Sequence, residues 1–165
     1  MLNYEKAASF GNELRALSLK SLKRFAALSI FTMKPEVQNS TYEMEILVTP
    51  EMTAKLDGRE IHAVYSTFWL CYHAEVAARK AIEPYFEEGE NAVGGEVCMR
   101  HEAMAAVGDT VFLKATVSEV KDKKIVCTIE ARTAKKRVAR GHQTQIILPD
   151  KVLKSMVLEA KENIF

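Results

Sequence analysis

Two hydrophobic periodicities alternate along the chain, and they predict its elements. From Asn3 to about Met33, apolar residues recur near a 3.6-residue period, which indicates an amphipathic helix that ends before Pro35. After the loop PEVQNS, the run TYEMEILV alternates acidic and apolar residues, as a half-buried strand does. The chain is therefore expected to begin with a helix and to continue into a strand, after which a loop that contains LDG is expected.

The stretch STFWLCYHAEVAARKAIEPYF, from Ser66 to Phe86, is apolar at most positions and too long for a strand. Ser66 or Thr67 can cap a helix, and Pro84 is placed to end it. The near-continuous apolarity predicts a helix that is buried on most sides. Glu75 lies in its middle, and an ionised carboxylate away from water is costly unless it is paired or has a task.

Strand-like patterns return after this helix and continue to residue 148. The turns between them are short or contain glycine, which predicts an antiparallel meander. A last amphipathic helix opens at Pro149 and Asp150. The expected fold class is α+β, with an antiparallel sheet wrapped around one long hydrophobic helix. The four predicted strands are AVGGEVCMRHEA, DTVFLKATVSEV, KKIVCTIEARTA and RVARGHQTQIIL.

Composition narrows the domain organisation and the partners. With 165 residues, 48% of them hydrophobic, the chain fits one globular domain at 39–165 and a helical extension at 1–38. Residues 1–34 carry six basic and two acidic side chains, although the whole chain has a net charge of only +1. No global field attracts nucleic acid or anionic lipid. No run approaches the roughly 18 apolar residues of a membrane span, so we expect a cytoplasmic protein.

Neither the cysteines nor the H-x-E run of the sequence has the pattern of a metal site. Cys71, Cys98 and Cys127 lack metal-ligand spacing and lie in apolar runs, so reduced core residues are expected. The H-x-E run from His73 to Glu75 occurs in zinc deaminases, but the P-C-x-x-C partner motif is absent from this sequence. The sequence predicts neither a metal nor a redox cofactor.

Three residues together indicate acyl-transfer chemistry, although each alone has an ordinary structural interpretation. Thr67 alone caps a helix, Glu75 alone pairs with Arg79 one turn on, and His101 alone ends a strand. Hydroxyl, carboxylate and imidazole are nevertheless the groups that an acyl-transfer site combines. They form the candidate catalytic set.

The glycine pair at Gly94 and Gly95 is the candidate for substrate binding. Two glycines inside a strand indicate either a bulge or a close approach of the backbone to a ligand. In the second case, a backbone N–H at this point would face a developing oxyanion.

The runs YSTFWLCYHAEVAARKAIEPYF and AVGGEVCMRHEAMAAVGDTV resemble the hot-dog-fold thioesterases of the fluoroacetyl-CoA thioesterase type. The resemblance covers residues 42–148. In that family a threonine stands eight residues before a helix glutamate, and a histidine stands twenty-six after it. Thr67, Glu75 and His101 match this spacing without a gap, and Gly94 matches the family's strand glycine.

The last strand departs from the family pattern. These thioesterases commonly carry G-x-H-x-R there, whereas this chain has Gln143 and Gln145 in place of the histidine and arginine. No phenylalanine-rich counterpart of the family's pocket lid is present in TAKLDGREIHAV.

The resemblance implies a hot-dog fold, a homodimer or higher homo-oligomer, and a site between subunits. It also implies hydrolysis of a small or medium acyl-CoA to free acid and CoA. Glu75 would act as general base or nucleophile, His101 would orient or exchange the proton, and Thr67 would position water or attack the thioester. Two alternatives stay open: a non-catalytic acyl-CoA-binding module and a hot-dog dehydratase.

Overall fold

The computed structural model describes residues 33–162. The helix predicted from Asn3 to Met33 lies outside this range except for its last residue. The compact unit that contains the predicted motifs runs from Thr32 to Phe165. Within the described range, no helix is both long and apolar enough to cross a membrane.

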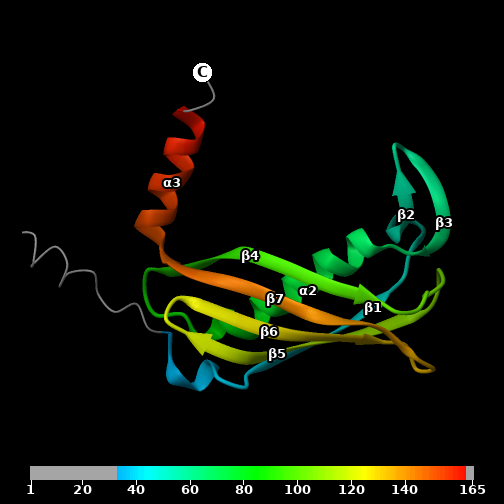
Figure 1. The fold of residues 1–165 in the computed structure, drawn as a ribbon, viewed down its shortest axis with the longest axis horizontal. Coiled ribbons are helices and arrows are strands. Elements are labelled where there is room, and N and C mark those ends of the chain that lie inside the picture. Colours follow the sequence, from blue (N-terminus) through cyan, green and yellow to red (C-terminus); the bar gives the residue numbers. More distant parts are fainter. Residues whose placement is uncertain (1–32, 163–165) are drawn as a thin grey trace, which may run out of the picture. The chain divides into compact units, whose positions relative to one another are not determined.

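A five-stranded antiparallel sheet forms the body of this unit (Figure 1). Each of the five strands lies within two residues of the stretch that the sequence predicts for it. The order across the sheet makes the first and last of them edge strands. In that order the strands are β1 (Thr41–Leu47), β5 (Thr110–Lys121), β6 (Lys124–Arg132), β7 (Arg137–Pro149) and β4 (Glu90–His101).

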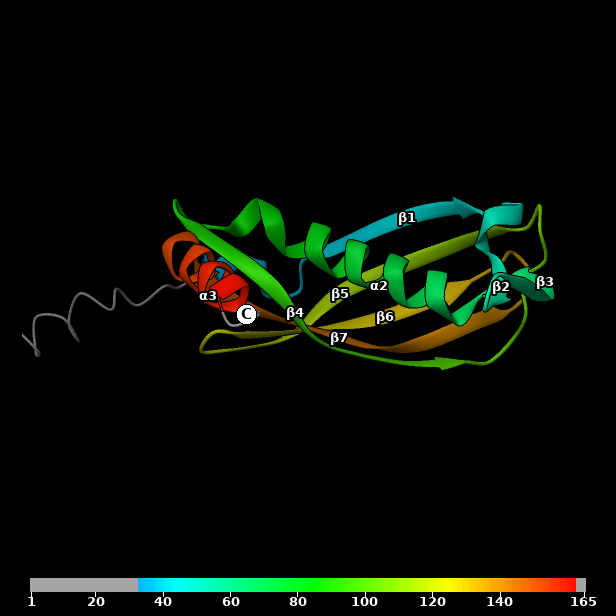
Figure 2. The ribbon, with the colours of Figure 1, turned by 90° about the horizontal axis from the view of Figure 1, so that it is seen from above.

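Helix α2 (Thr67–Ile82) runs along one face of the sheet (Figure 2). Ser66 caps it, because the Ser66 hydroxyl accepts a hydrogen bond from the Trp69 N–H at 3.2 Å. Small side chains on the sheet-facing side allow close packing. The buried residues on this side are Leu70, Ala74, Ala77, Ala78, Ala81 and Ile82.

The prediction that α2 is buried on most sides is wrong. Phe68 and Tyr72 are 72% and 52% exposed, and Glu75 is also exposed. These three residues recur at helical spacing, so they form one stripe on the side away from the sheet. The apolar residues of this stripe made the sequence pattern resemble that of a fully buried helix.

The predicted meander is correct for β5, β6 and β7 and wrong for β4. Strand β4 pairs with β7 instead of β5. The connection between β4 and β5 crosses the end of the sheet: the Glu102 N–H donates to Val138 O, and the Gly108 N–H donates to Val48 O. Alternation along a strand fixes its two faces but not its neighbour, so the sequence pattern does not contain this crossing.

A small hairpin of β2 (Thr53–Leu56) and β3 (Arg59–Tyr65) occupies the region predicted as a loop. Asp57 and Gly58 form its turn with positive φ values of 50° and 74°. Asp-Gly is a strong signal for this kind of turn, so the hairpin was readable from the sequence.

Four further short elements complete the described chain. Helix α3 (Asp150–Glu162) begins at the predicted Asp150. The 3₁₀ turns are η1 (Pro35–Val37), η2 (Pro50–Met52) and η3 (Glu83–Tyr85).

His73 and the three cysteines differ in how deeply their side chains are buried. His73 is buried, and its Nδ1 lies 2.7 Å from the Tyr65 hydroxyl. All three cysteines are free. Cys127 is buried as predicted, Cys71 is half-buried, and Cys98 is exposed on the edge strand β4, which corrects the expectation of a core residue.

Candidate active site

Thr67 and His101 meet although they are 34 residues apart in the sequence. Thr67 is the first residue of α2, and His101 is the last residue of β4. The Thr67 Oγ1 lies 3.1 Å from His101 Nδ1, within hydrogen-bonding distance. The helix start and the strand end thus bring one predicted hydroxyl–imidazole pair together.

Burial lowers the pKa of His101 below its usual value of 6.5. The ring is therefore neutral at pH 7. In the tautomer protonated at Nε2, Nδ1 accepts a hydrogen bond from the Thr67 hydroxyl. The His101 Nε2 is buried and has no hydrogen-bond partner among residues 33–162. The His101 imidazole is therefore placed to take the proton of the Thr67 hydroxyl.

Glu75 lies two turns further along α2, opposite Gly94 of β4. A Cβ placed on Gly94 would overlap Glu75 Oε1 and lie 3.1 Å from Glu75 Cδ. Only glycine therefore lets the carboxylate approach this strand so closely. The register also shifts between Gly94 and Glu96, so the glycine pair includes a bulge. The close approach at Gly94 is to the Glu75 side chain, and an approach of the backbone to a ligand stays a prediction.

Gly95 points to the other face of the sheet. A Cβ there would lie 3.2 Å from Ile146 Cγ1, away from Glu75. Of the two glycines, Gly94 alone lies beside the predicted carboxylate.

Within one chain, the structure does not bring Thr67 and Glu75 together. Both belong to the continuous helix α2, and eight residues at ~1.5 Å rise separate them by ~12 Å along its axis. The candidate residues therefore form two groups. One contains Thr67 and His101, and the other contains Glu75 and Gly94.

The structural alternative for Glu75, an ion pair with Arg79, is absent. Arg79 donates instead to Asn91 Oδ1 at 2.8 Å and to Ala92 O at 2.9 Å, and it stacks over the Phe86 ring. Glu75 has neither an ion pair nor a side-chain hydrogen bond within the described range. Its carboxylate is free to act on a ligand.

A pocket of about 510 Å³ opens beside Glu75, between α2 and strands β4 and β7. Gly94 and Gln145 line its strand side, and Tyr72, Glu75 and Val76 line its helix side. Its volume falls within the ~300–1,000 Å³ of typical small-molecule sites.

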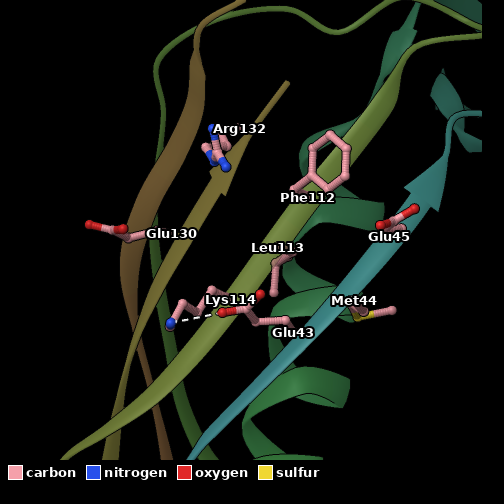
Figure 3. A pocket seen from close by; sticks show the side chains of 8 residues that line it. All are labelled: Glu43, Met44, Glu45, Phe112, Leu113, Lys114, Glu130 and Arg132. Carbon is pink, nitrogen blue, oxygen red and sulfur yellow. Dashed lines mark hydrogen bonds and ion pairs between the residues drawn. The ribbon is translucent and has the colours of Figure 1, made fainter. Parts of the chain in front are cut away.

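A second pocket lies over β1, β5 and β6, where Lys114 pairs with Glu43 at 2.8 Å (Figure 3). It contains none of the candidate residues. Lys114 and Glu43 pair across neighbouring strands, which suits an exposed sheet face.

In the sequence, Gln143 and Gln145 stand out only as departures from a family pattern. Both side chains are buried, at 0% and 2% exposure, and Gln145 lines the Glu75 pocket. One feature of the sequence could have predicted this burial. The two glutamines occupy alternate, inward-facing positions of a strand whose other inward residues are apolar or glycine.

Most of the chain matches a known protein family. Residues 48–151 match the family described as fluoroacetyl-CoA-specific thioesterase. The chain belongs to this thioesterase family. The family match contains Thr67, Glu75, Gly94 and His101, so both groups of candidate residues lie inside it.

One curated protein of known activity is similar in sequence to this chain. The curated fluoroacetyl-CoA thioesterase of Streptantibioticus cattleyicolor is 27% identical over 89 residues, which cover 53% of this chain and 64% of the relative. The chain thus spans less than two thirds of that relative's length.

Two solved structures share the fold. A thioesterase superfamily member from Thermus thermophilus is 32% identical, with a TM-score of 0.76 over 79% of this chain and 97% of its own. A hot-dog-like protein from Thermanaerovibrio acidaminovorans is 22% identical, with a TM-score of 0.71 over 76% of this chain and 94% of its own. The predicted hot-dog fold is confirmed.

Proposed function

We propose that this chain hydrolyses a small or medium acyl-CoA thioester to the free acid and CoA. The observation that supports this most is the Glu75 carboxylate, which has no ion pair among residues 33–162 and is held against Gly94 at the wall of a pocket, in a chain of the thioesterase family. A free carboxylate at a pocket wall is suited to act as general base or nucleophile.

In the general-base route, Glu75 takes a proton from water while the water oxygen bonds to the thioester carbonyl carbon. The tetrahedral intermediate then expels the CoA sulfur, which leaves as a thiolate and takes up a proton. A backbone N–H near Gly94 or Gly95 would stabilise the oxyanion. Thr67 and His101 would orient the carbonyl or exchange protons, since their hydrogen bond couples hydroxyl and imidazole.

The complete site is proposed to lie between two subunits of a cytoplasmic homodimer. Thr67 and His101 of one chain would then meet Glu75 of the other. Two features support this arrangement. The outer edge of β4 is unpaired in the sheet, and the exposed Phe68 and Tyr72 share the stripe of α2 that carries Glu75.

A thiol-release assay across acyl-CoAs of increasing chain length tests the proposed reaction. Hydrolysis frees the CoA thiol, so we expect turnover with at least one short or medium acyl chain. Saturable acyl-CoA binding without thiol release would identify a binding module instead. Loss of water from a hydroxyacyl-CoA without thiol release would identify a dehydratase. Either result would overturn the proposal.

A further inference from the structure

Helix α3 carries an apolar stripe that the described chain leaves open. Val152, Met156 and Val157 are 43%, 51% and 48% exposed, and they lie on one side of the helix with the half-buried Leu153. The charged side chains of α3 occupy the other side. A helix of 13 residues is only marginally stable by itself in water, because most helical stability comes from packing an amphipathic face. The stripe is therefore expected to be covered.

Helix α3 is an addition to the family core, since the family match ends at residue 151. Figure 1 shows α3 and the β2–β3 hairpin projecting on the same side of the sheet, past the edge strand β4. In Figure 2, the two projections lie at opposite ends of α2. They are thus separated by the length of the sheet within one chain.

Hydrogen bonds fix each projection to one end of β4. The Asp150 N–H at the start of α3 donates to Gly89 O at 2.9 Å, directly before β4 begins. At the other end, the Tyr65 N–H of the hairpin donates to Ala105 O at 2.8 Å, shortly after β4 ends at His101. Helix α3 therefore stands at the beginning of β4, and the hairpin stands at its end.

A twofold pairing of the free β4 edges would bring α3 and the hairpin of different chains together. A second copy related by a twofold axis normal to the sheet runs antiparallel at this edge strand. The beginning of β4 in one copy then lies beside the end of β4 in the other. Helix α3 of one chain is thereby carried to the hairpin of the other, on the same side of the combined sheet.

The hairpin end of the chain offers apolar surface for the α3 stripe. Leu56 and Ile61 of the hairpin and Met104 beside it are exposed large hydrophobic residues. Exposed apolar side chains that share a region mark interaction surfaces. The hairpin and α3 each carry equal numbers of acidic and basic residues, so no net charge opposes their contact.

We propose that the apolar stripe of α3 packs on the β2–β3 hairpin of a second copy of this chain, so that each subunit clamps the hairpin of the other. This inference rests on the homodimer of the proposed function. Strand β3 ends at Tyr65, two residues before Thr67. The clamp therefore acts on the segment that positions Thr67 beside His101 in the other subunit.

Cross-linking at chosen positions tests this contact. Cys98→Ser first removes the exposed native thiol. In that background, chains with Met156→Cys are mixed with chains with Ile61→Cys, subunits are allowed to exchange, and a short bis-maleimide is added. We expect covalent pairs of mixed composition, in which peptide mass spectrometry finds the link between positions 156 and 61. Leu56→Cys provides a second hairpin position if the Ile61 variant does not fold.

Leu158 provides the matched control on the same helix. It is 59% exposed, but it lies two residues from Met156 and therefore about 160° away around the helix. Leu158→Cys should give few or no mixed links. In the otherwise wild-type chain, Met156→Asp should raise the Kd of the dimer at least about tenfold, because it places a charge against apolar surface. Leu158→Asp should leave the Kd within about twofold, as measured by analytical ultracentrifugation.

Three results would overturn the proposal. These are mixed dimers without the link between positions 156 and 61, equal linking from position 158, and links only between the two copies of position 156, which would pair α3 with α3. A chain that stays monomeric would also overturn it. Cross-linking needs no turnover, so a dimer without the predicted link but with thiol release would leave the proposed reaction intact. The predicted link without thiol release would reject the reaction and keep the contact.

Discussion

Glu75 stands at the centre of the proposed chemistry because its carboxylate is held against a strand without being neutralised. The strand accepts it only because residue 94 is glycine, and Arg79, the nearest cation along the helix, is occupied with Asn91 and Ala92. Because Glu75 is exposed, water can solvate its carboxylate, which leaves it available to a ligand. This environment leads to a direct prediction for Glu75.

Glu75→Gln should lower kcat by at least about 100-fold, because a general base typically contributes ~10²–10⁴. The fold should persist, since Glu75 is exposed and makes no ion pair in the described part of the chain. Circular dichroism and thermal melting check the fold, and thiol release gives the rate. A variant with near-wild-type kcat would leave Glu75 without a catalytic role.

His73 should make the stability of the folded protein depend on pH. Burial lowers the pKa of His73 below 6.5, and its Nδ1 lies against the Tyr65 hydroxyl. Below pH 6.5 the unfolded chain therefore binds more protons than the folded one at this site. The stability present above pH 6.5 is lost as the pH falls toward and through the folded pKa.

We expect the urea midpoint of the wild-type protein to fall between about pH 7.5 and pH 5.5, and to fall less in His73→Gln. His62→Gln is the matched control, because it makes the same substitution at a histidine that is exposed on β3. An equal pH dependence in the wild-type and His73→Gln proteins would show that His73 does not contribute to it.

At the scale of elements, the start of α2 determines where Thr67 lies. Ser66 caps the helix, Thr67 follows as its first residue, and the Ser66 N–H donates to Met52 O at 3.0 Å. The threonine hydroxyl is thus directed at His101 by the local structure of one helix end.

Ser66→Ala should lower the free energy of unfolding by about 0.5–2 kcal/mol, because the cap to the Trp69 N–H is lost. Ser66→Thr keeps a capping hydroxyl and should lie closer to the wild-type value. Chemical denaturation measures both. Equal stability of Ser66→Ala and the wild-type protein would rule out a contribution from the cap.

Local sequence signals were sufficient for most elements and insufficient for their arrangement. The alternation in Thr41–Leu47 and the cap at Ser66 are local, so the strand and the helix start were predictable. The pairing of β4 with β7 depends on contacts between residues distant in the chain, which periodicity does not encode. The exposure of Glu75 was missed for a different reason: Phe68 and Tyr72 are apolar residues on an open stripe.

The candidate site, too, could be predicted only in part from the sequence. Spacing and family resemblance selected Thr67, Glu75, His101 and Gly94, and the structure shows that they form two separated groups. The catalytic roles of these residues stay predictions. The burial of the Gln143 amide, which has no hydrogen-bond partner among residues 33–162, depends on the three-dimensional structure and cannot be predicted from spacing.

At the scale of the molecule, the boundary of the domain can be tested by truncation. The predicted extension ends at residue 38, and this boundary stays a prediction. However, Met33 and Val37 belong to the core, at 8% and 2% exposure. We therefore place the start of the folded unit before Met33.

A variant that lacks residues 1–31 should melt close to the full chain. A variant that lacks residues 1–38 should be less stable, because fully burying a side chain such as valine contributes about 1.5–3 kcal/mol. Thermal melting of the two truncated proteins decides between the boundaries. Equal melting temperatures would support the boundary at residue 38.

We propose that one site takes Thr67 and His101 from one subunit and Glu75 from the other. The most direct measurement mixes inactive Thr67→Ala and Glu75→Ala chains, allows subunit exchange, and follows thiol release from acyl-CoA. Each mixed dimer regains one intact site, so an equal mixture should recover about a quarter of the wild-type rate. Mixed dimers that form, as native mass spectrometry would show, and yet remain inactive would contradict the account and assign the whole site to a single chain.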